Sequence, residues 1–176
     1  GHEAQRRMMQ SSVLMIGVSG LGIEVSKNCV LAGIHQLTLV DDNFADEYDL
    51  NANFYLNESK LGQPRARVCK EPLSQLNPYV KVKVVENVAI SANNQVLKEL
   101  VQNHTVCVVT MPLPESKLVE LNELCRANDC CFVYSVTMSV FSQVFCDFGN
   151  EFVITDVDGE PASTSQIESV FNDGTV

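Results

Sequence analysis

An apolar run that leads into three closely spaced glycines constrains the fold of this chain more than any other feature. Residues 13–22 read VLMIGVSGLG, with glycines at positions 17, 20 and 22. A helix-like segment, IEVSKNCVLAGI, and a strand-like segment, QLTLVDD, follow directly. A strand, a glycine loop, a helix and a second strand that ends in an acid form the first unit of a nucleotide-binding fold. The question is whether this loop binds a nucleotide.

Strand-like and helix-like segments alternate along most of the chain. The patterns predict strands over 12–17, 36–40, 80–85, 105–110 and 130–136, and helices over 21–31, 64–77, 95–102 and 115–128. Pro72 is expected to kink or split the helix over 64–77. The alternation predicts an α/β fold with a doubly wound, Rossmann-like, mostly parallel sheet and helices on both faces.

The pattern changes after about residue 138. The β-rich runs FSQVFCDF and EFVITDV are joined by Gly149-Asn150, which predicts a β-hairpin at this point. The run Asn-Asp-Gly at 172–174 predicts a tight turn whose returning strand is missing. We therefore predict a C-terminal β extension, one domain over 1–154 and the start of a second over 155–176. We also expect the chain to be a piece of a longer protein.

Charge and cysteine content exclude several classes of partner and site. The formal net charge is −10, and an acidic surface repels both nucleic acid and anionic membranes. No apolar run approaches the roughly 18 residues that a membrane-spanning helix needs. The seven cysteines include no C-x-x-C pair, which argues against a zinc site and favours a reducing compartment, the cytoplasm or the nucleus.

The glycine loop and the acid after the second strand are the candidate ligand-binding residues. Glycines at a strand-to-helix turn let a phosphate approach the helix N-terminus, and Asp41 is placed to bind a ribose hydroxyl. The spacing here is G-x-x-G-x-G, whereas the dinucleotide-binding pattern is G-x-G-x-x-G. Two interpretations follow from the residues. Either the loop binds a nucleotide, or its glycines serve packing alone.

Several longer motifs carry a family resemblance. The runs GLGIEVSKNCVLAGIHQLTLVDD, DLNANFYL, LGQPRARV and LNPYVKV resemble the superfamily of ubiquitin-activating enzymes, whose bacterial relatives activate the sulfur carriers of molybdopterin and thiamine synthesis. The runs GHEAQRRM and FSQVFCDFGNEFVITDVDGEP are similar to the eukaryotic ubiquitin-activating enzymes. They match the first, inactive adenylation-type half and its junction with the first catalytic-cysteine half-domain.

The resemblance implies a function for the whole protein. Such an enzyme adenylates the ubiquitin C-terminus with MgATP, forms a thioester on its own cysteine and passes ubiquitin to a conjugating enzyme. The implied partners are ubiquitin, ubiquitin-conjugating enzymes and the active adenylation half of the same chain. The same resemblance places the nucleotide in that other half.

The resemblance also implies that the residues needed for adenylation are replaced in this half. Active relatives carry an arginine that reaches the phosphates, where this chain has Ala52, and a lysine where it has Arg65. Met111 and Pro112 lie where active relatives have an aspartate near the metal. Gly17, Gly20, Gly22 and Asp41 would then form a remnant loop. We expect no catalytic residue, no metal ligand and no bound cofactor in this chain.

Other candidate residues have simpler interpretations. Cys69, beside Arg67 and Lys70, is the most plausible reactive thiol, although a chance surface position explains it better. His2, His35 and His104 are expected to be solvated or capping residues, and the acidic residues over 41–49 a solvated face. Two other functions remain open: the corresponding subunit of an enzyme for another ubiquitin-like protein, and a dinucleotide-dependent oxidoreductase that uses Asp41.

Overall fold

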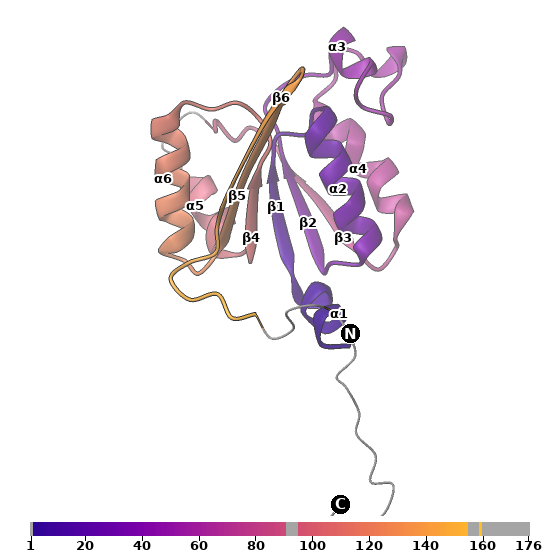
Figure 1. The fold of residues 1–176 in the computed structure, drawn as a ribbon. Coiled ribbons are helices and arrows are strands. Elements are labelled where there is room, and N and C mark those ends of the chain that lie inside the picture. The colour runs from indigo at the N-terminus through magenta and orange to yellow at the C-terminus, as the bar shows by residue number, and fades with distance from the viewer. Residues whose placement is uncertain (1, 91–94, 155–158, 160–176) are drawn as a thin grey trace, which may run out of the picture.

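A six-stranded sheet forms the centre of the molecule (Figure 1). The computed structural model describes residues 2–90, 95–154 and 159. The strands lie in the order β3-β2-β1-β4-β5-β6. Their bounds are β1 (Ser12–Ile16), β2 (Gln36–Val40), β3 (Lys81–Val85), β4 (Val106–Val109), β5 (Cys131–Met138) and β6 (Phe141–Asp147). The first five strands run parallel and β6 runs antiparallel to β5, which confirms the predicted mostly parallel, doubly wound sheet.

Helices cover both faces of this sheet. In Figure 1, α2 (Gly20–Ala32) and α4 (Arg65–Leu76) lie on one face, and α5 (Gln95–Gln102) and α6 (Glu115–Arg126) lie on the other. The short helix α3 (Glu47–Leu50) and the 3-10 turn η1 (Glu58–Lys60) lie in the connection between β2 and α4. The N-terminal helix α1 (His2–Gln10) has no buried residue and precedes β1.

The two faces form two separate hydrophobic cores, because successive side chains of a strand point to opposite sides. In β1, Val13 and Met15 enter the core beneath α2 and α4. Leu14 and Ile16 enter the core beneath α5 and α6. The central strand is therefore apolar at both alternating sets of positions, as is typical of a parallel strand that helices cover twice.

The hairpin predicted at Gly149-Asn150 is wrong in the residues that the structure describes. Strand β6 pairs instead with β5, through the two-residue turn Ser139-Val140, and residues 151–154 form no strand. Ser139 takes the left-handed conformation there (φ 56°), although the turn contains no glycine. Beyond β6, the Asp147 carboxylate accepts a hydrogen bond from the Gly149 N–H at 3.0 Å, which turns the chain away from the sheet.

The helix is not split at Pro72, and the alternative, a kink there, stays a prediction. Helix α4 runs without interruption from Arg65 to Leu76, with Pro72 inside it. The proline removes one backbone N–H donor, but Cys69 and Leu73 on either side of it are fully buried against the sheet. Packing of this apolar face supplies the stability that the lost hydrogen bond would have given.

Two further expectations concern the ends of the molecule. The predicted turn at 172–174 and the domain boundary at 154/155 involve residues outside the described part, so both stay predictions. In the described part, no helix is long and apolar enough to cross a bilayer.

Candidate functional site

The glycine loop lies between β1 and α2, at the carboxyl edge of the parallel strands. Gly17 has a positive φ of 93°, a conformation that L side chains rarely adopt. At Gly22, an added Cβ would lie 2.1 Å from the Gly17 carbonyl oxygen and 2.5 Å from Thr110 Oγ1. Both glycines are therefore required for the close approach of α2 to the ends of β1 and β4, whatever the loop binds.

Ala52 lies directly over the start of α2. A Cβ added at Gly20 would lie 2.7 Å from the Ala52 Cβ. Beside this contact is a cavity of about 260 Å³, at the place where a phosphate would approach the helix. The residues that line it in the described structure include no charged side chain; they are Ser19, Gly20, Leu21, Ala52, Thr110, Pro112, Val136, Thr137 and Met138.

The Asp41 carboxylate is buried and fully engaged within the protein. Its side chain is 0% exposed, and one oxygen accepts the Val18 N–H of the glycine loop at 2.7 Å. The other oxygen accepts the backbone N–H and the side-chain amide of Asn43, both at 3.0 Å. Arg65 donates to both oxygens, from Nε at 2.9 Å and from Nη2 at 3.2 Å. A ribose hydroxyl would have to displace one of these donors to reach Asp41.

Arg65 joins Asp41 to a second buried carboxylate. Its Nη1 lies 3.0 Å from each oxygen of Asp49. Desolvation alone would lower the pKa of Arg65, but the hydrogen bonds and charges of Asp41 and Asp49 outweigh it and raise the pKa. The guanidinium therefore stays charged in the interior, and it faces two carboxylates rather than the cavity.

Asp49 also organises the loop that follows β2. It forms a capping box with Asp46: the Asp49 N–H donates to Asp46 Oδ1 at 3.0 Å, and the Asp46 N–H donates to Asp49 Oδ2 at 3.2 Å. The buried network of Asp41, Asp49 and Arg65 thus connects β2, α3, α4 and the glycine loop. It holds two carboxylates against one guanidinium, so it carries an uncompensated negative charge.

The sequence interpretation missed this network. It treated the acids over 41–49 as a solvated face, which is wrong for Asp41 and Asp49. The acids were visible in the sequence, but their common partner Arg65 comes 16 residues after Asp49, on a different helix. The sequence did show an arginine, Arg65, at the start of the helix over 64–77. This position is equally compatible with a phosphate and with buried carboxylates as its partner.

The structure contradicts the interpretation of Cys69, whereas His2 and His35 are exposed to solvent as expected. Cys69 is buried, burial raises the pKa of its thiol, and it contacts the Asn53 amide, so it is not a reactive surface thiol. His104 is buried and not solvated, but it caps the C-terminal end of α5, which was the other role expected for these histidines; desolvation lowers its pKa. In the described ranges, no group of three or more His, Cys, Asp and Glu side chains could hold a metal ion.

The hydrogen bonds of His104 define its protonation. Its Nδ1 lies 2.6 Å from the Leu100 carbonyl oxygen, which can only accept, so Nδ1 carries the proton. Its Nε2 lies 2.7 Å from Thr38 Oγ1 and accepts the hydroxyl proton. His104 therefore has a structural role between α5 and β2.

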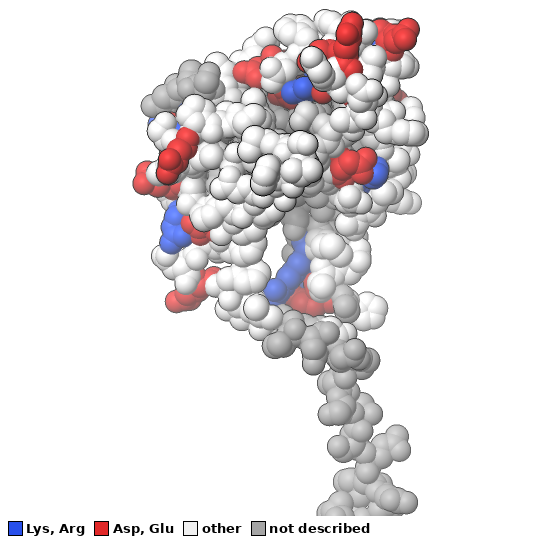
Figure 2. All heavy atoms as spheres, turned by 45° about the horizontal axis from the view of Figure 1, so that its top comes forward, with Lys and Arg blue, Asp and Glu red and all other residues white. Residues whose placement is uncertain are grey.

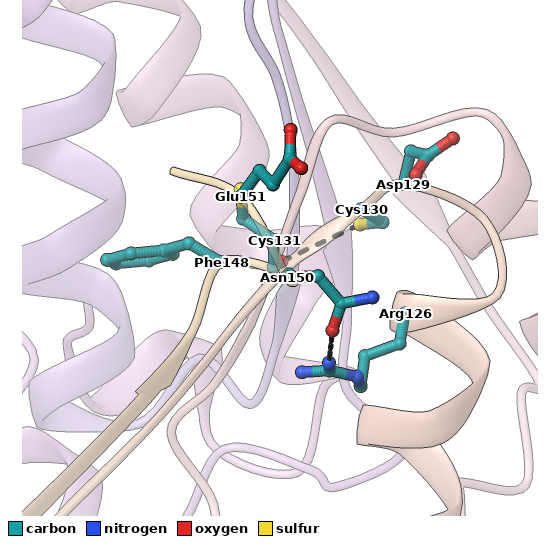
Figure 3. A pocket seen from close by; sticks show the side chains of 8 residues that line it. Arg126, Asp129, Cys130, Cys131, Phe148, Asn150 and Glu151 are labelled. Atoms are coloured by element: carbon teal, nitrogen blue, oxygen red, sulfur yellow. Dashed lines mark hydrogen bonds between the residues drawn. The ribbon is translucent and has the colours of Figure 1, made fainter. Parts of the chain in front are cut away.

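A larger polar cavity, of about 520 Å³, lies at the opposite edge of the sheet (Figure 3). It is lined by Arg126, Asp129, Cys130, Cys131, Phe148, Gly149, Asn150 and Glu151. Arg126 Nη1 forms hydrogen bonds to Asp147 Oδ1 at 2.6 Å and to Asp147 Oδ2 at 2.7 Å, and its Nη2 donates to the Asn150 side chain. This cavity adjoins the start of β5, whereas ligands of doubly wound folds bind at the carboxyl ends of the strands.

Three curated proteins illustrate what this chain is similar to. The chain is 38% identical to ubiquitin-activating enzyme E1 1 of Schizosaccharomyces pombe, over 100% of the chain and 16% of that protein. It is 37% identical to ubiquitin-activating enzyme E1 1 of Triticum aestivum and 35% identical to human ubiquitin-like modifier-activating enzyme 1, in each case over 98% of the chain. The chain thus spans 16% of the length of each of these relatives.

A solved structure supports the fold, and a family model supports the family. Escherichia coli MccB, in a crystal structure with ATP, superposes with a TM-score of 0.66 at 21% identity, over 74% of this chain and 39% of that one. At this identity the likeness concerns the fold. A model of the ThiF family matches residues 1–169. The chain belongs to the ThiF family.

Proposed function

We propose that this chain is the non-catalytic adenylation-type half of a ubiquitin-activating enzyme. The whole enzyme would adenylate the ubiquitin C-terminus with MgATP, form a thioester and pass ubiquitin to a conjugating enzyme. The names of the relatives support ubiquitin activation, and the motifs shared with eukaryotic enzymes support the first half. All seven cysteines are free thiols, which supports a location in the reducing cytoplasm or nucleus.

The uncharged cavity beside the glycine loop carries the proposal. Binding a triphosphate requires cationic donors for its charge and a carboxylate that holds Mg²⁺. The cavity has neither, since Arg65 is turned toward Asp41 and Asp49. Each missing charge-assisted contact is worth roughly 1.5–3 kcal/mol. Two missing contacts would weaken binding by about two to four powers of ten if they add.

The proposed role of this half is to pair with the active half and to help form a platform for ubiquitin. Edge strand β6 supports this role, because it exposes large apolar side chains: Phe141 is 74% exposed and Val144 is 65% exposed. Apolar surface of this kind marks interaction sites. In this arrangement MgATP belongs to the active half, and the glycine loop of this chain has only a structural role.

Calorimetric titration with MgATP tests the proposal, on this chain alone and on its complex with the active half. We expect no saturable heat from the chain alone and one MgATP per complex. Micromolar binding to the chain alone, or two nucleotides per complex, would contradict it. NADH fluorescence under the same conditions addresses the oxidoreductase alternative, which the buried state of Asp41 disfavours.

A further inference from the structure

Two cysteines meet at the turn that connects α6 to β5. The Cys125 carbonyl oxygen accepts the backbone N–H of Asn128 and that of Cys130, both at 3.0 Å. Asp129 takes the left-handed conformation (φ 51°) within this turn. The hydrogen bond from Cys130 to Cys125 keeps their Cα atoms within about 7 Å of each other, and disulfides join Cα atoms that are about 4.4–6.8 Å apart. The backbone therefore holds the pair near the separation that a disulfide needs.

The two thiols also contact each other, in the core beneath α5 and α6. Cys107 of β4, Cys125 and Cys130 all belong to this core, and they are 0%, 0% and 5% exposed. The Cys125 thiol lies in hydrogen-bonding contact with the thiols of Cys107 and Cys130. Contact with Cys107 raises the pKa of Cys125, and contact with Cys125 raises the pKa of Cys130. All three residues are free cysteines, and the shifts keep Cys125 and Cys130 protonated near neutral pH.

Cys130 connects this thiol cluster to the polar cavity of about 520 Å³ beside the start of β5 (Figure 3). Of the three thiols in contact, Cys130 alone contributes to the cavity lining. A small oxidant in the cavity therefore reaches Cys130 first, and Cys125 lies directly behind it. Among the described residues, the Asp129 and Glu151 carboxylates in the lining have no hydrogen-bond or ion-pair partner, which favours a cationic reagent. Acidic side chains are also prominent on the face of the molecule that Figure 2 shows.

We propose that Cys125 and Cys130 form a reversible disulfide when a small-molecule disulfide enters this cavity. The Cys130 thiol loses its proton to water, and its sulfur attacks one sulfur of the small disulfide. The S–S bond of the reagent breaks, and the thiolate that leaves takes up a proton from water. The Cys125 sulfur then attacks the Cys130 sulfur, and the Cys125 proton passes to the second thiolate that leaves. The protein loses two electrons, and the small disulfide gains them as it becomes two thiols.

Proximity makes the second step efficient. Cys125 is already in contact with Cys130, so its attack is intramolecular, whereas an outside thiol would have to enter the cavity. Disulfides in a reducing compartment are usually transient and often sense the redox state, which is the role that this pair fits. The cavity lies at the opposite edge of the sheet from the glycine loop, so the inference holds whether or not that loop binds a nucleotide.

Peptide mapping after treatment with cystamine tests the proposal. Cystamine is a small disulfide with two amines; the 176-residue chain is treated with it under native conditions and quenched with acid, and its remaining thiols are alkylated. Trypsin cleaves after Arg126, between the two cysteines, so their disulfide joins peptides 118–126 and 127–176. We expect this linked pair in the treated chain, with two hydrogen atoms fewer than the two peptides, and we expect dithiothreitol to separate it.

Single substitutions identify the sulfur atoms, because peptide 127–176 contains three cysteines. Cys125→Ala and Cys130→Ala should each abolish the linked pair. Cys131→Ala and Cys146→Ala are the matched controls, and both should retain it. Circular dichroism checks that each variant is folded. Fragmentation of the linked peptides in the mass spectrometer assigns the same sulfur atoms in the parent chain, so the assignment does not depend on the stability of a variant.

The exposed Cys146 reports whether the reagent is active, because an adduct there requires only access to solvent. Adducts on Cys146 without any linked pair would overturn the proposal. So would a linked pair that persists in Cys130→Ala, or one that joins peptide 118–126 to the Cys107 peptide, 99–117.

Discussion

At the residue scale, the Arg65 guanidinium holds two buried carboxylates that come from different segments of the chain. Its own side chain is 10% exposed, and those of Asp41 and Asp49 are 0% and 5% exposed. Two buried acids without a counter-charge are costly, because desolvation penalises each ionised form. Arg65 therefore stabilises the fold at the position where the resemblance expected a residue that serves a phosphate.

Replacement of Arg65 tests this role. Arg65→Ala should lower the free energy of unfolding by about 3–5 kcal/mol, because it leaves Asp41 and Asp49 buried without their partner. Arg65→Lys should cost less, since it keeps the charge but loses the planar fork. Urea denaturation measures both. The control is Arg67→Ala, which removes an exposed ion pair with Glu86 and should change stability little. Equal losses for Arg65→Ala and Arg67→Ala would refute this role.

At this scale, the sequence predicted where Asp41 lies along the chain but not which groups its side chain contacts. It placed Asp41 at the end of the second strand, where the structure has it, because the apolar run before it ends there. It did not find that Arg65 and the Val18 N–H already occupy the Asp41 carboxylate. Side-chain partners 23 or 24 residues apart depend on how the helices pack, which local patterns do not encode.

At the scale of elements, helix α2 packs so closely on the ends of β1 and β4 that the glycine loop has no room for a side chain. Gly22→Ala would place a Cβ against the Gly17 carbonyl and Thr110. The Gly17 backbone cannot move aside as a flexible side chain can. We therefore expect the substitution to lower the free energy of unfolding by about 3 kcal/mol, the upper end of the range for overpacking.

Thermal unfolding of Gly22→Ala measures this loss. The control is Gly62→Ala, where φ is 73° but no atom lies within 4 Å of the added Cβ. Gly62→Ala should lower the free energy of unfolding by only about 1–2 kcal/mol, because a side chain is strained at this positive φ but meets no other atom. A Gly22→Ala protein as stable as the parent would show that the glycines do not serve packing.

The elements also show where local signals mislead. The central strands and helices α2, α4, α5 and α6 were predictable, because buried parallel strands and amphipathic helices leave clear periodicity, whereas the short helix α3 was not predicted. The dipeptide Gly149-Asn150 favoured a hairpin. In the structure, Asp147 binds both Arg126 and the Gly149 N–H, and these contacts hold residues 147–149 in a different conformation. The real turn, Ser139-Val140, has none of the glycine, asparagine or aspartate residues that mark two-residue hairpins, and the seven-residue pairing of β5 with β6 holds it in place.

At the scale of the whole molecule, the chain combines a nucleotide-binding architecture with an uncharged loop cavity and exposed apolar and aromatic surfaces. The sequence predicted the architecture, because five strands and their helices follow one another at family spacing. It did not predict the exposure of Phe44, Tyr48 and Phe54, because this exposure depends on how the connection between β2 and α4 folds. The relatives are about six times longer, so much of the surface has further partners in the proposed enzyme.

The most direct test of the central claim is a residue-resolved NMR titration of the chain with MgATP. If the glycine loop is only structural, the backbone amide signals of residues 17–22 will not move up to millimolar nucleotide. The uncharged cavity and the engaged Asp41 carboxylate predict this result. Saturable shifts at these amides, with a micromolar dissociation constant, would contradict the account.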